Sequence, residues 1–202
     1  MLSDLGPIEI SEIAPVGFYL ALRVGFAFPV EEINKLPVEW VSHYTQQRLM
    51  MFDPVIQWVY AHTGAIRWSE MACDDPRNVM GQAQTFGLRY GVAVAVFDGN
   101  ALGQRSFGSF ARSDREMTDN EIRTLHEFVR EQHAMSAPPS NLTEAETEAL
   151  RLVKEGQRLK QIAHDLGVSE GAVKQRLKNA KAKLGAKTSP QAATLATRHG
   201  LI

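Results

Sequence analysis

The chain has 202 residues, of which 44% are hydrophobic and 22% are charged, and its formal net charge is −1 at pH 7. This composition is ordinary for soluble globular protein, and the length allows one large domain or two modest ones. We expect no membrane-spanning segment, because the longest apolar runs, such as 91–97, fall far short of the roughly 20 residues needed to cross a bilayer. We also expect no secretion, because the N-terminus lacks the basic start of a secretory signal.

The first 133 residues carry a mixture of predicted strands and helices. β-Prone runs predict strands at 18–24, 92–97 and 105–111, and Asp98-Gly99-Asn100 predicts the hairpin turn between the last two. Apolar residues at helical spacing predict four helices, which cover residues 37–50, 54–62, 78–86 and 118–133. The simplest assembly is an α/β/α sandwich, in which a small, mostly antiparallel sheet carries helices on its faces.

Residues 134–141 are small, polar and proline-rich and show no periodicity, which predicts a linker between two domains. The domains are then 1–133 and 142–202. The second contains eleven Lys/Arg and six Asp/Glu, a net charge of +5, whereas residues 1–141 have a net charge of −6. A compact basic module beside an acidic domain is the charge distribution expected when one domain binds a polyanion.

Four helices are predicted in the module, which makes the whole chain α+β. Thr143 stands three residues before Glu146, and this capping box begins a first helix that ends near Gly156. A second helix over 159–166 ends at Gly167. A tight turn then leads into a third helix, and this arrangement is typical of a helix-turn-helix.

Ser169 is expected to cap the third helix, in which Val173 and Leu177 lie on the apolar side. The remaining sides are cationic, as a helix requires if it enters the major groove while packed on its neighbours. A solvated lysine face on an ordinary helix is the alternative, but the turn and the charge of the module favour DNA binding. The candidate contacts to phosphates and bases are Lys174, Gln175, Arg176, Lys178, Asn179 and Lys181.

The fourth helix, 190–199, has the small residues Ala192, Ala193 and Ala196 close together. Small residues permit close helix approach, which fits either a dimer contact or packing within the module. A dimer would place two recognition helices one DNA turn apart, roughly 34 Å, and would predict a two-fold symmetric operator.

A set of polar-tipped side chains in the first domain predicts a small-molecule pocket. Trp40 and Tyr44 share a helix face, Asp53 begins the next helix, and Trp68 and Ser109 follow. An indole N–H, a phenol, a carboxylate and a hydroxyl on an apolar wall can orient a ligand that contains an amide. The alternatives are ordinary core packing for the aromatic residues and a helix start for Asp53-Pro54.

Catalytic and metal-binding patterns are absent from the sequence. The six histidines lack a pair at ligand spacing with a third partner, and neither a phosphate-binding glycine loop nor Gly-x-Ser-x-Gly occurs. An acid–base enzyme built on Trp40, Tyr44 and Asp53 would lack a nucleophile and a second acid. We therefore expect no enzyme and no metal. The single cysteine, Cys73, cannot form an intrachain disulfide and fits a reducing cytoplasm.

The basic module resembles the LuxR-type helix-turn-helix along its whole length. Arg176 departs from the histidine of many relatives and adds a positive charge that favours phosphate contact. The matching residues are Leu142-Thr143, Glu146, Leu150, Gly156, Ile162-Ala163, Leu166-Gly167-Val168-Ser169, Val173-Lys174, Asn179, Lys183-Leu184-Gly185 and Gly200-Leu201-Ile202.

The spacing Trp-x3-Tyr-x8-Asp-Pro-x13-Trp, which begins at Trp40, resembles the autoinducer-binding domain of LuxR-type quorum-sensing receptors. The resemblance implies that Trp40 donates to the lactone carbonyl of an N-acyl-homoserine lactone and that Asp53 accepts the amide N–H. It implies that Tyr44 and Trp68 shape the pocket, to which Gly91 and Ser109 also align. Leu36 replaces a tyrosine that contacts the acyl carbonyl in many receptors.

The resemblance implies a dimeric, cytoplasmic quorum-sensing regulator of transcription, with an N-acyl-homoserine lactone as ligand and no other cofactor. Its expected partners are double-stranded DNA, a second copy of the chain or another LuxR-type receptor, and RNA polymerase, but no membrane. Only about seventeen residues precede the first predicted strand, where the family carries a longer helix, so the sensor domain is shortened. This departure motivates the alternative of a ligand-independent regulator or an antagonist that pairs with a full-length receptor.

Overall fold

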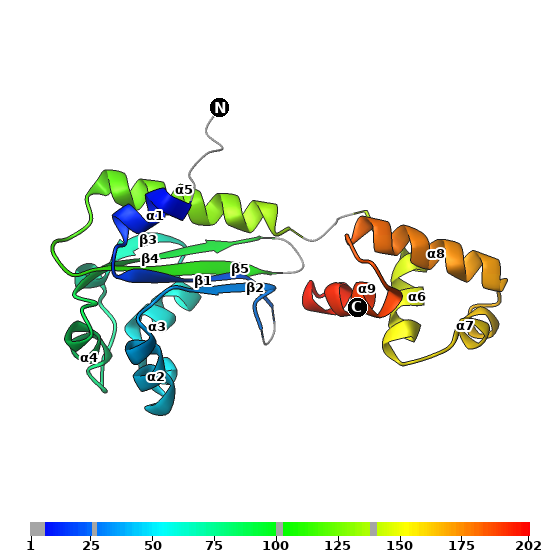
Figure 1. Cartoon of the computed structure of the whole chain (residues 1–202), viewed down its shortest axis with the longest axis horizontal. Coiled ribbons are helices and arrows are strands. Elements are labelled where there is room, and N and C mark those ends of the chain that lie inside the picture. Colours follow the sequence, from blue (N-terminus) through cyan, green and yellow to red (C-terminus); the bar gives the residue numbers. More distant parts are fainter. Residues whose placement is uncertain (1–6, 26–27, 100–102, 138–140) are drawn as a thin grey trace. The chain divides into compact units, whose positions relative to one another are not determined.

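The computed structural model describes residues 7–25, 28–99, 103–137 and 141–202, with only the backbone described for residues 7–9. The chain forms two compact units, of which one includes residues 7–24 and 31–136 and the other includes residues 141–202 (Figure 1). No helix in the described ranges is both long and apolar enough to span a membrane. The predicted α+β fold class is confirmed.

The larger unit is built on a five-stranded sheet in the order β2-β1-β5-β4-β3, in which every neighbouring pair is antiparallel. The three predicted strands are confirmed, and two short edge strands join them. The strands are β1 (Gly17–Val24), β2 (Glu31–Asn34), β3 (Gly64–Arg67), β4 (Tyr90–Phe97) and β5 (Arg105–Arg112). The predicted turn between β4 and β5 falls partly on Asn100, which lies outside the described residues.

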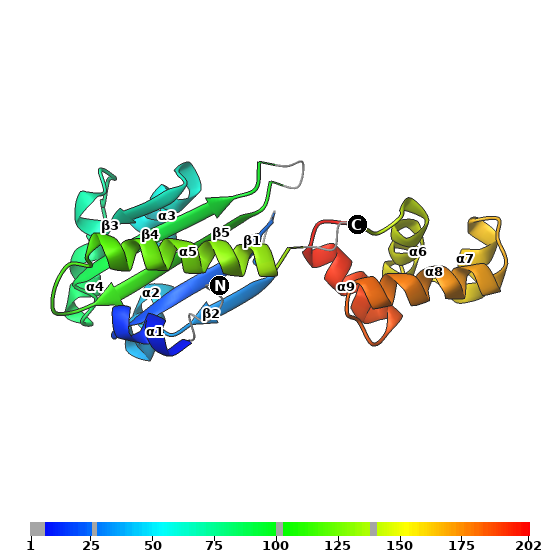
Figure 2. The same ribbon diagram turned by 90° about the horizontal axis from the view of Figure 1, so that it is seen from above.

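Helices cover both faces of this sheet, which confirms the α/β/α sandwich (Figure 1, Figure 2). One face carries α1 (Pro7–Ile13) and α5 (Asp119–Met135). The other carries α2 (Val38–Gln46), α3 (Pro54–Ala61) and α4 (Val79–Thr85), together with the 3₁₀ turns η1 (Leu49–Phe52) and η2 (Trp68–Glu70).

The period-2 alternation of the strands divides the core between these two layers. On β1, Leu20 and Leu22 are fully buried against α1 and α5, in one cluster with Phe110 of β5. Ala21 lies on the opposite face, in a second cluster with residues of α3. Because β1 and β5 are central strands, both of their faces are covered.

Two helix boundaries differ from the sequence prediction by more than one residue. The helix predicted over 37–50 ends at Gln46, because Arg48 adopts a positive φ of 53° and starts η1. The apolar spacing continues through this break, so periodicity alone does not detect it. At the other end of the unit, α5 extends to Met135, so the first two residues of the predicted linker are helical. Residues 138–140 of that linker lie outside the described ranges.

A buried polar network fixes the C-terminal end of α5 to the sheet. The Arg23 backbone N–H donates to Ser106 Oγ (2.9 Å), which also forms a hydrogen bond with His133 Nδ1 (2.7 Å). Because the Asp98 carboxylate is an acceptor, His133 Nε2 is the nitrogen that donates to Asp98 Oδ1 (3.0 Å). The Arg23 guanidinium pairs with Asp98 and donates to the His133 carbonyl. Ser106 is fully buried, so this serine–histidine–aspartate series is structural and not a hydrolase site.

The smaller unit is the predicted four-helix module, formed by α6 (Glu144–Lys154), α7 (Leu159–Asp165), α8 (Glu170–Lys183) and α9 (Ser189–Arg198). The caps occur where the sequence predicts them: Thr143 and Glu146 form a capping box, and Ser169 accepts the backbone N–H of Ala172. Gly156 and Gly167 follow their helices with φ of 82° and 63°, which glycine adopts without strain.

The small residues of α9 are used inside the module. Ala192, Ala193 and Ala196 are buried in the same core cluster as Leu150 of α6 and Val173 of α8. Of the two alternatives for this stripe, the structure therefore shows packing within the module.

Candidate functional site

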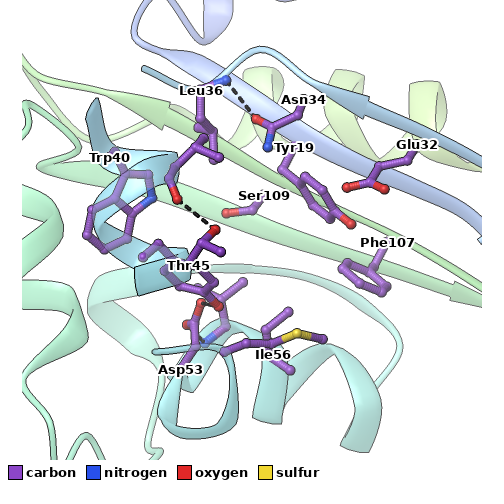
Figure 3. Close-up of a pocket in the computed structure, with 14 residues that line it drawn as sticks. Tyr19, Glu32, Asn34, Leu36, Trp40, Thr45, Asp53, Ile56, Phe107 and Ser109 are labelled. Carbon is purple, nitrogen blue, oxygen red and sulfur yellow. Dashed lines mark hydrogen bonds between the residues drawn. The ribbon is translucent and has the colours of Figure 1, made fainter. Parts of the chain in front are cut away.

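A cavity of about 270 Å³ lies in the larger unit between the sheet and the helices α2 and α3 (Figure 3). Four of the five predicted ligand contacts line it: Trp40, Tyr44, Asp53 and Ser109. The other polar lining residues are Tyr19, Glu32, Asn34 and Thr45, and the apolar ones are Leu36, Val41, Met50, Val55, Ile56 and Phe107.

The sheet register sets the floor of this cavity. Tyr19 of β1 pairs with Ser109 of β5 on one side and with Asn34 of β2 on the other. Since neighbouring strands are roughly 4.8 Å apart, this polar row extends about 10 Å from the sheet centre to its edge. Two residues along, Ala21 stands between Phe107 and Glu32. The small alanine leaves room above the sheet.

Asp53 is fixed by two hydrogen bonds that use both of its carboxylate oxygens. It caps α3, where Oδ1 accepts the Val55 backbone N–H (2.8 Å), while Oδ2 accepts the Tyr44 hydroxyl (2.7 Å). Pro54 suits the first helical position because its φ is already helical. The helix-start interpretation and the pocket interpretation of Asp53 therefore hold together, because one oxygen of the carboxylate serves each.

The pair formed by Asp53 and Tyr44 lies in a poorly solvated environment. Burial raises the pKa of the Asp53 carboxyl, and the hydrogen bonds from Tyr44 and Val55 oppose this only in part. Burial and the neighbouring charge of Asp53 raise the pKa of the Tyr44 phenol. In the described part of the chain no lysine or arginine forms an ion pair with Asp53. A ligand N–H group would thus donate to a carboxylate whose negative charge is not balanced by an ion pair in the described part of the chain.

Trp40 forms the wall of the cavity. Its side chain is 5% exposed, and its ring lies 5.3 Å from that of Tyr44 and 5.5 Å from that of Phe86. Figure 3 shows the indole nitrogen on the cavity side of the ring, across from Ser109. A donor from α2 and a hydroxyl from β5 therefore face the same space.

Trp68 is the predicted contact that is not among the lining residues. It begins η2 and packs over the backbone of β4, where a Cβ atom on Gly91 would lie 2.3 Å from its Cε2 atom. A glycine at position 91 is required by this close approach. The Trp68 Nε1 atom is buried without a hydrogen-bond partner among the described residues. Its ring contacts both core clusters on this face of the sheet.

Four polar residues of the cavity escaped the sequence analysis: Tyr19, Glu32, Asn34 and Thr45. Burial raises the pKa of the Tyr19 phenol, and so do the charge and hydrogen bond of Glu32. The alternation of β1 puts Tyr19 on the same face as Ala21, a signal that was present in the sequence. Glu32 and Asn34 gave no such signal, because β2 has only four residues, of which two are charged.

The second candidate site is the exposed face of α8 in the smaller unit. Lys174, Gln175, Lys178 and Asn179 are exposed, Arg176 and Lys181 are half-buried, and Val173, Leu177 and Ala180 pack inward. Gln175 Nε2 donates to Asn179 Oδ1 (2.8 Å), so the two amides are held as a pair. None of the four candidate cations forms an ion pair within the described residues.

Lys183, at the end of the same helix, has a different environment. Its Nζ donates to Glu146 Oε2 (2.7 Å) and Oε1 (3.0 Å) and to the Asn141 carbonyl (2.7 Å). Burial alone would raise the pKa of Glu146, but hydrogen bonds from Lys183 and the Thr143 backbone hold it below its ordinary value. Lys183 therefore joins α8 to the start of α6.

Comparisons with known proteins match each of the two units to a known family. Residues 23–133 match the family described as autoinducer binding domain, and residues 140–196 match the family described as bacterial regulatory proteins, luxR family. Regulatory protein SdiA of Escherichia coli is 27% identical over 82% of this chain and 74% of its own length. Transcriptional activator protein AhyR of Aeromonas hydrophila is 28% identical over 84% of this chain and 72% of its own.

Solved structures extend the likeness to the fold. A crystal structure of Escherichia coli SdiA covers 92% of this chain and 83% of its own, with a TM-score of 0.50 at 27% identity. A structure of SdiA in complex with octanoyl-rac-glycerol covers 96% of this chain and 85% of its own, with a TM-score of 0.53 at 24% identity.

Proposed function

The chain belongs to the LuxR family of DNA-binding transcription regulators with an autoinducer-binding domain, and we propose that it regulates transcription in response to an N-acyl-homoserine lactone. The lactone binds in the cavity between the sheet and α2 and α3. One observation carries this proposal: Trp40, Tyr44 and Asp53 converge on a single cavity with Ser109, which lies more than fifty residues further along the chain.

The chemistry of the lining suits the head of such a ligand. The Asp53 carboxylate accepts the amide N–H, and a hydrogen bond to a charged acceptor is about twice as strong as a neutral one. Trp40 donates its indole N–H to the lactone carbonyl. Tyr44 holds the carboxylate through the 2.7 Å bond to Oδ2 and thereby orients it. Leu36 lines the cavity without adding a further polar contact.

Ligand binding acts on the output through linkage. A ligand that fills the cavity stabilises the folded sensor unit, and with it a homodimer that places two copies of α8 on a two-fold symmetric operator. Sedimentation of the protein with a palindromic duplex tests the dimer: we expect two chains per duplex. One chain per duplex would contradict it.

Thermal denaturation of the purified chain with a panel of N-acyl-homoserine lactones tests the sensing function. We expect the sensor unit to be stabilised by about 2.7 kcal/mol when the free lactone is at a hundred times its Kd. The ring-opened form of the same lactone is the matched control, because it keeps the amide and the acyl chain but replaces the neutral lactone by a charged carboxylate and a hydroxyl. Equal melting temperatures with and without every lactone would exclude this function.

The DNA-binding face is tested by Lys174→Ala. If Lys174 contacts a phosphate, the substitution weakens operator binding severalfold and lowers the slope of log K against log salt by about one unit, since one fewer counterion is released. Lys154→Ala, at an exposed lysine of α6, is the control and leaves the slope unchanged. Fluorescence anisotropy over a salt series provides the measurement. A wild-type slope in Lys174→Ala would remove this residue from the interface.

A further inference from the structure

The end of the cavity remote from Asp53 is also polar. Glu32 and Asn34 of the edge strand β2 line it, together with the phenol of Tyr19 from β1. Phe107, Ile56 and Val55 add apolar surface to the wall of the same cavity. The cavity is thus lined by polar and apolar side chains together, and a plain alkyl chain would match only the apolar ones.

Glu32 has acceptor capacity that the chain does not use. Figure 3 shows its carboxylate beside the Tyr19 hydroxyl, and the charge and hydrogen bond of Glu32 contribute to the raised pKa of that phenol. A carboxylate has two oxygens with about four acceptor positions. Within the described ranges no lysine, arginine or histidine forms an ion pair with Glu32.

The register fixes Glu32 on the cavity side of β2. It pairs with Ala21, which belongs to the core cluster shared with α3, and the small side chain of Ala21 leaves the carboxylate uncovered from that direction. The preceding residue, Glu31, pairs with Leu22, which faces α1 and α5. Two adjacent glutamates on one strand therefore face opposite sides of the sheet, and only Glu32 lines the cavity.

We propose that the ligand of this cavity is an acyl-homoserine lactone whose short acyl chain ends in a hydrogen-bond donor, a hydroxyl or an ammonium group, which Glu32 accepts. The inference rests on the proposed function, because it places the lactone head at Asp53 and Trp40. The polar row from Ser109 through Tyr19 to Asn34 spans about 10 Å, which limits the chain to a short one. Glu32 is exposed at the edge of the sheet, so an unsubstituted alkyl end would leave its carboxylate hydrated and would gain no contact from it.

Calorimetric titration tests this with three lactones of equal chain length that end in a methyl, a hydroxyl or an ammonium group. For the wild-type chain we expect the hydroxyl or the ammonium lactone to bind about tenfold more tightly than the methyl lactone, as one hydrogen bond to a charged group provides. In Glu32→Leu the order reverses, and the methyl lactone binds most tightly. Glu31→Leu is the matched control, since it removes the same charge from the other side of the strand and keeps the wild-type order.

The possible failures are distinguishable. If all three lactones bind wild type and Glu32→Leu with the same relative affinities, the proposed tail is wrong while lactone sensing stands, and Glu32 only protects the edge strand from pairing. If Glu31→Leu and Glu32→Leu change the order equally, the effect is one of net charge, and the contact is refuted. If no lactone of any tail binds the wild-type chain, the proposed function fails and this inference fails with it.

Discussion

Replacement of Asp53 by asparagine is expected to weaken lactone binding about ten- to a hundredfold and to leave the unliganded protein at least as stable as the wild type. Asparagine keeps a side-chain oxygen that can cap α3 through the Val55 N–H. It removes the charged acceptor for the ligand amide, and a hydrogen bond to a charged group contributes about 1.5–3 kcal/mol. Calorimetric titration of the lactone and thermal denaturation without it measure the two effects.

The expected stability of unliganded Asp53→Asn follows from the raised pKa of the Asp53 carboxyl, whose main cause is burial. Because the folded state holds this proton more tightly than the unfolded state, the ionised carboxylate destabilises the fold at neutral pH. That destabilisation declines as the pH falls from the folded pKa toward the unfolded value of about 3.9. The melting temperature of the wild type should therefore approach that of Asp53→Asn as the pH is lowered.

Comparing Asp53→Asn with Asp53→Ala separates the effect of the α3 cap from that of the charge. Asp53→Ala loses both the cap and the charge, so we expect weak lactone binding together with a loss of about 1 kcal/mol of stability at neutral pH. An Asp53→Asn protein that melts well below the wild type at pH 7 would mean that the carboxylate stabilises the unliganded fold, and the expected destabilisation by the buried charge would then be wrong.

The features that the sequence predicted correctly are those with local causes. The capping box of Thr143 and Glu146 and the serine cap at Ser169 each depend on two or three neighbouring residues. The strands β4 and β5 are eight residues long, and their β-prone composition is visible without any partner. Trp40, Tyr44 and Asp53, which the spacing and its family resemblance singled out, line the cavity, and their contact with a ligand stays a prediction.

The features that the sequence did not predict depend on distant parts of the chain. The strands β2 and β3 have four residues each, and their pairing with β1 and β4 makes them strands. The cavity position of Glu32 depends on its register with Ala21, which no local pattern encodes. Trp68 lies against Gly91 because η2 and β4 are adjacent in space. The packing of the α9 alanines likewise became visible only with α6 and α8 in place.

The ion pair between Lys183 and Glu146 leads to the largest expected change in stability. Lys183→Met keeps the aliphatic part of the side chain but leaves the Glu146 carboxylate buried without its cation, and removing one partner of a buried pair costs about 3 kcal/mol. Glu146→Gln should cost less, because the Lys183 side chain is 25% exposed and can turn its ammonium to water. The calorimetric transition of the smaller unit in the full chain measures both, since a chain of two units need not unfold in one step.

The pH dependence of the Lys183→Met effect follows from the lowered pKa of Glu146. A carboxyl with a depressed folded pKa stabilises the fold above its unfolded pKa, about 4.3, and this contribution is lost as the pH falls through the folded value. The gap between wild type and Lys183→Met should therefore be widest near pH 7 and narrow below about pH 4. Lys178→Met is the control, because this exposed lysine of α8 should change stability by less than about 0.5 kcal/mol while weakening DNA binding. If Lys183→Met instead weakens DNA binding with no change in the transition, then Lys183 contacts DNA and does not hold α8 to α6.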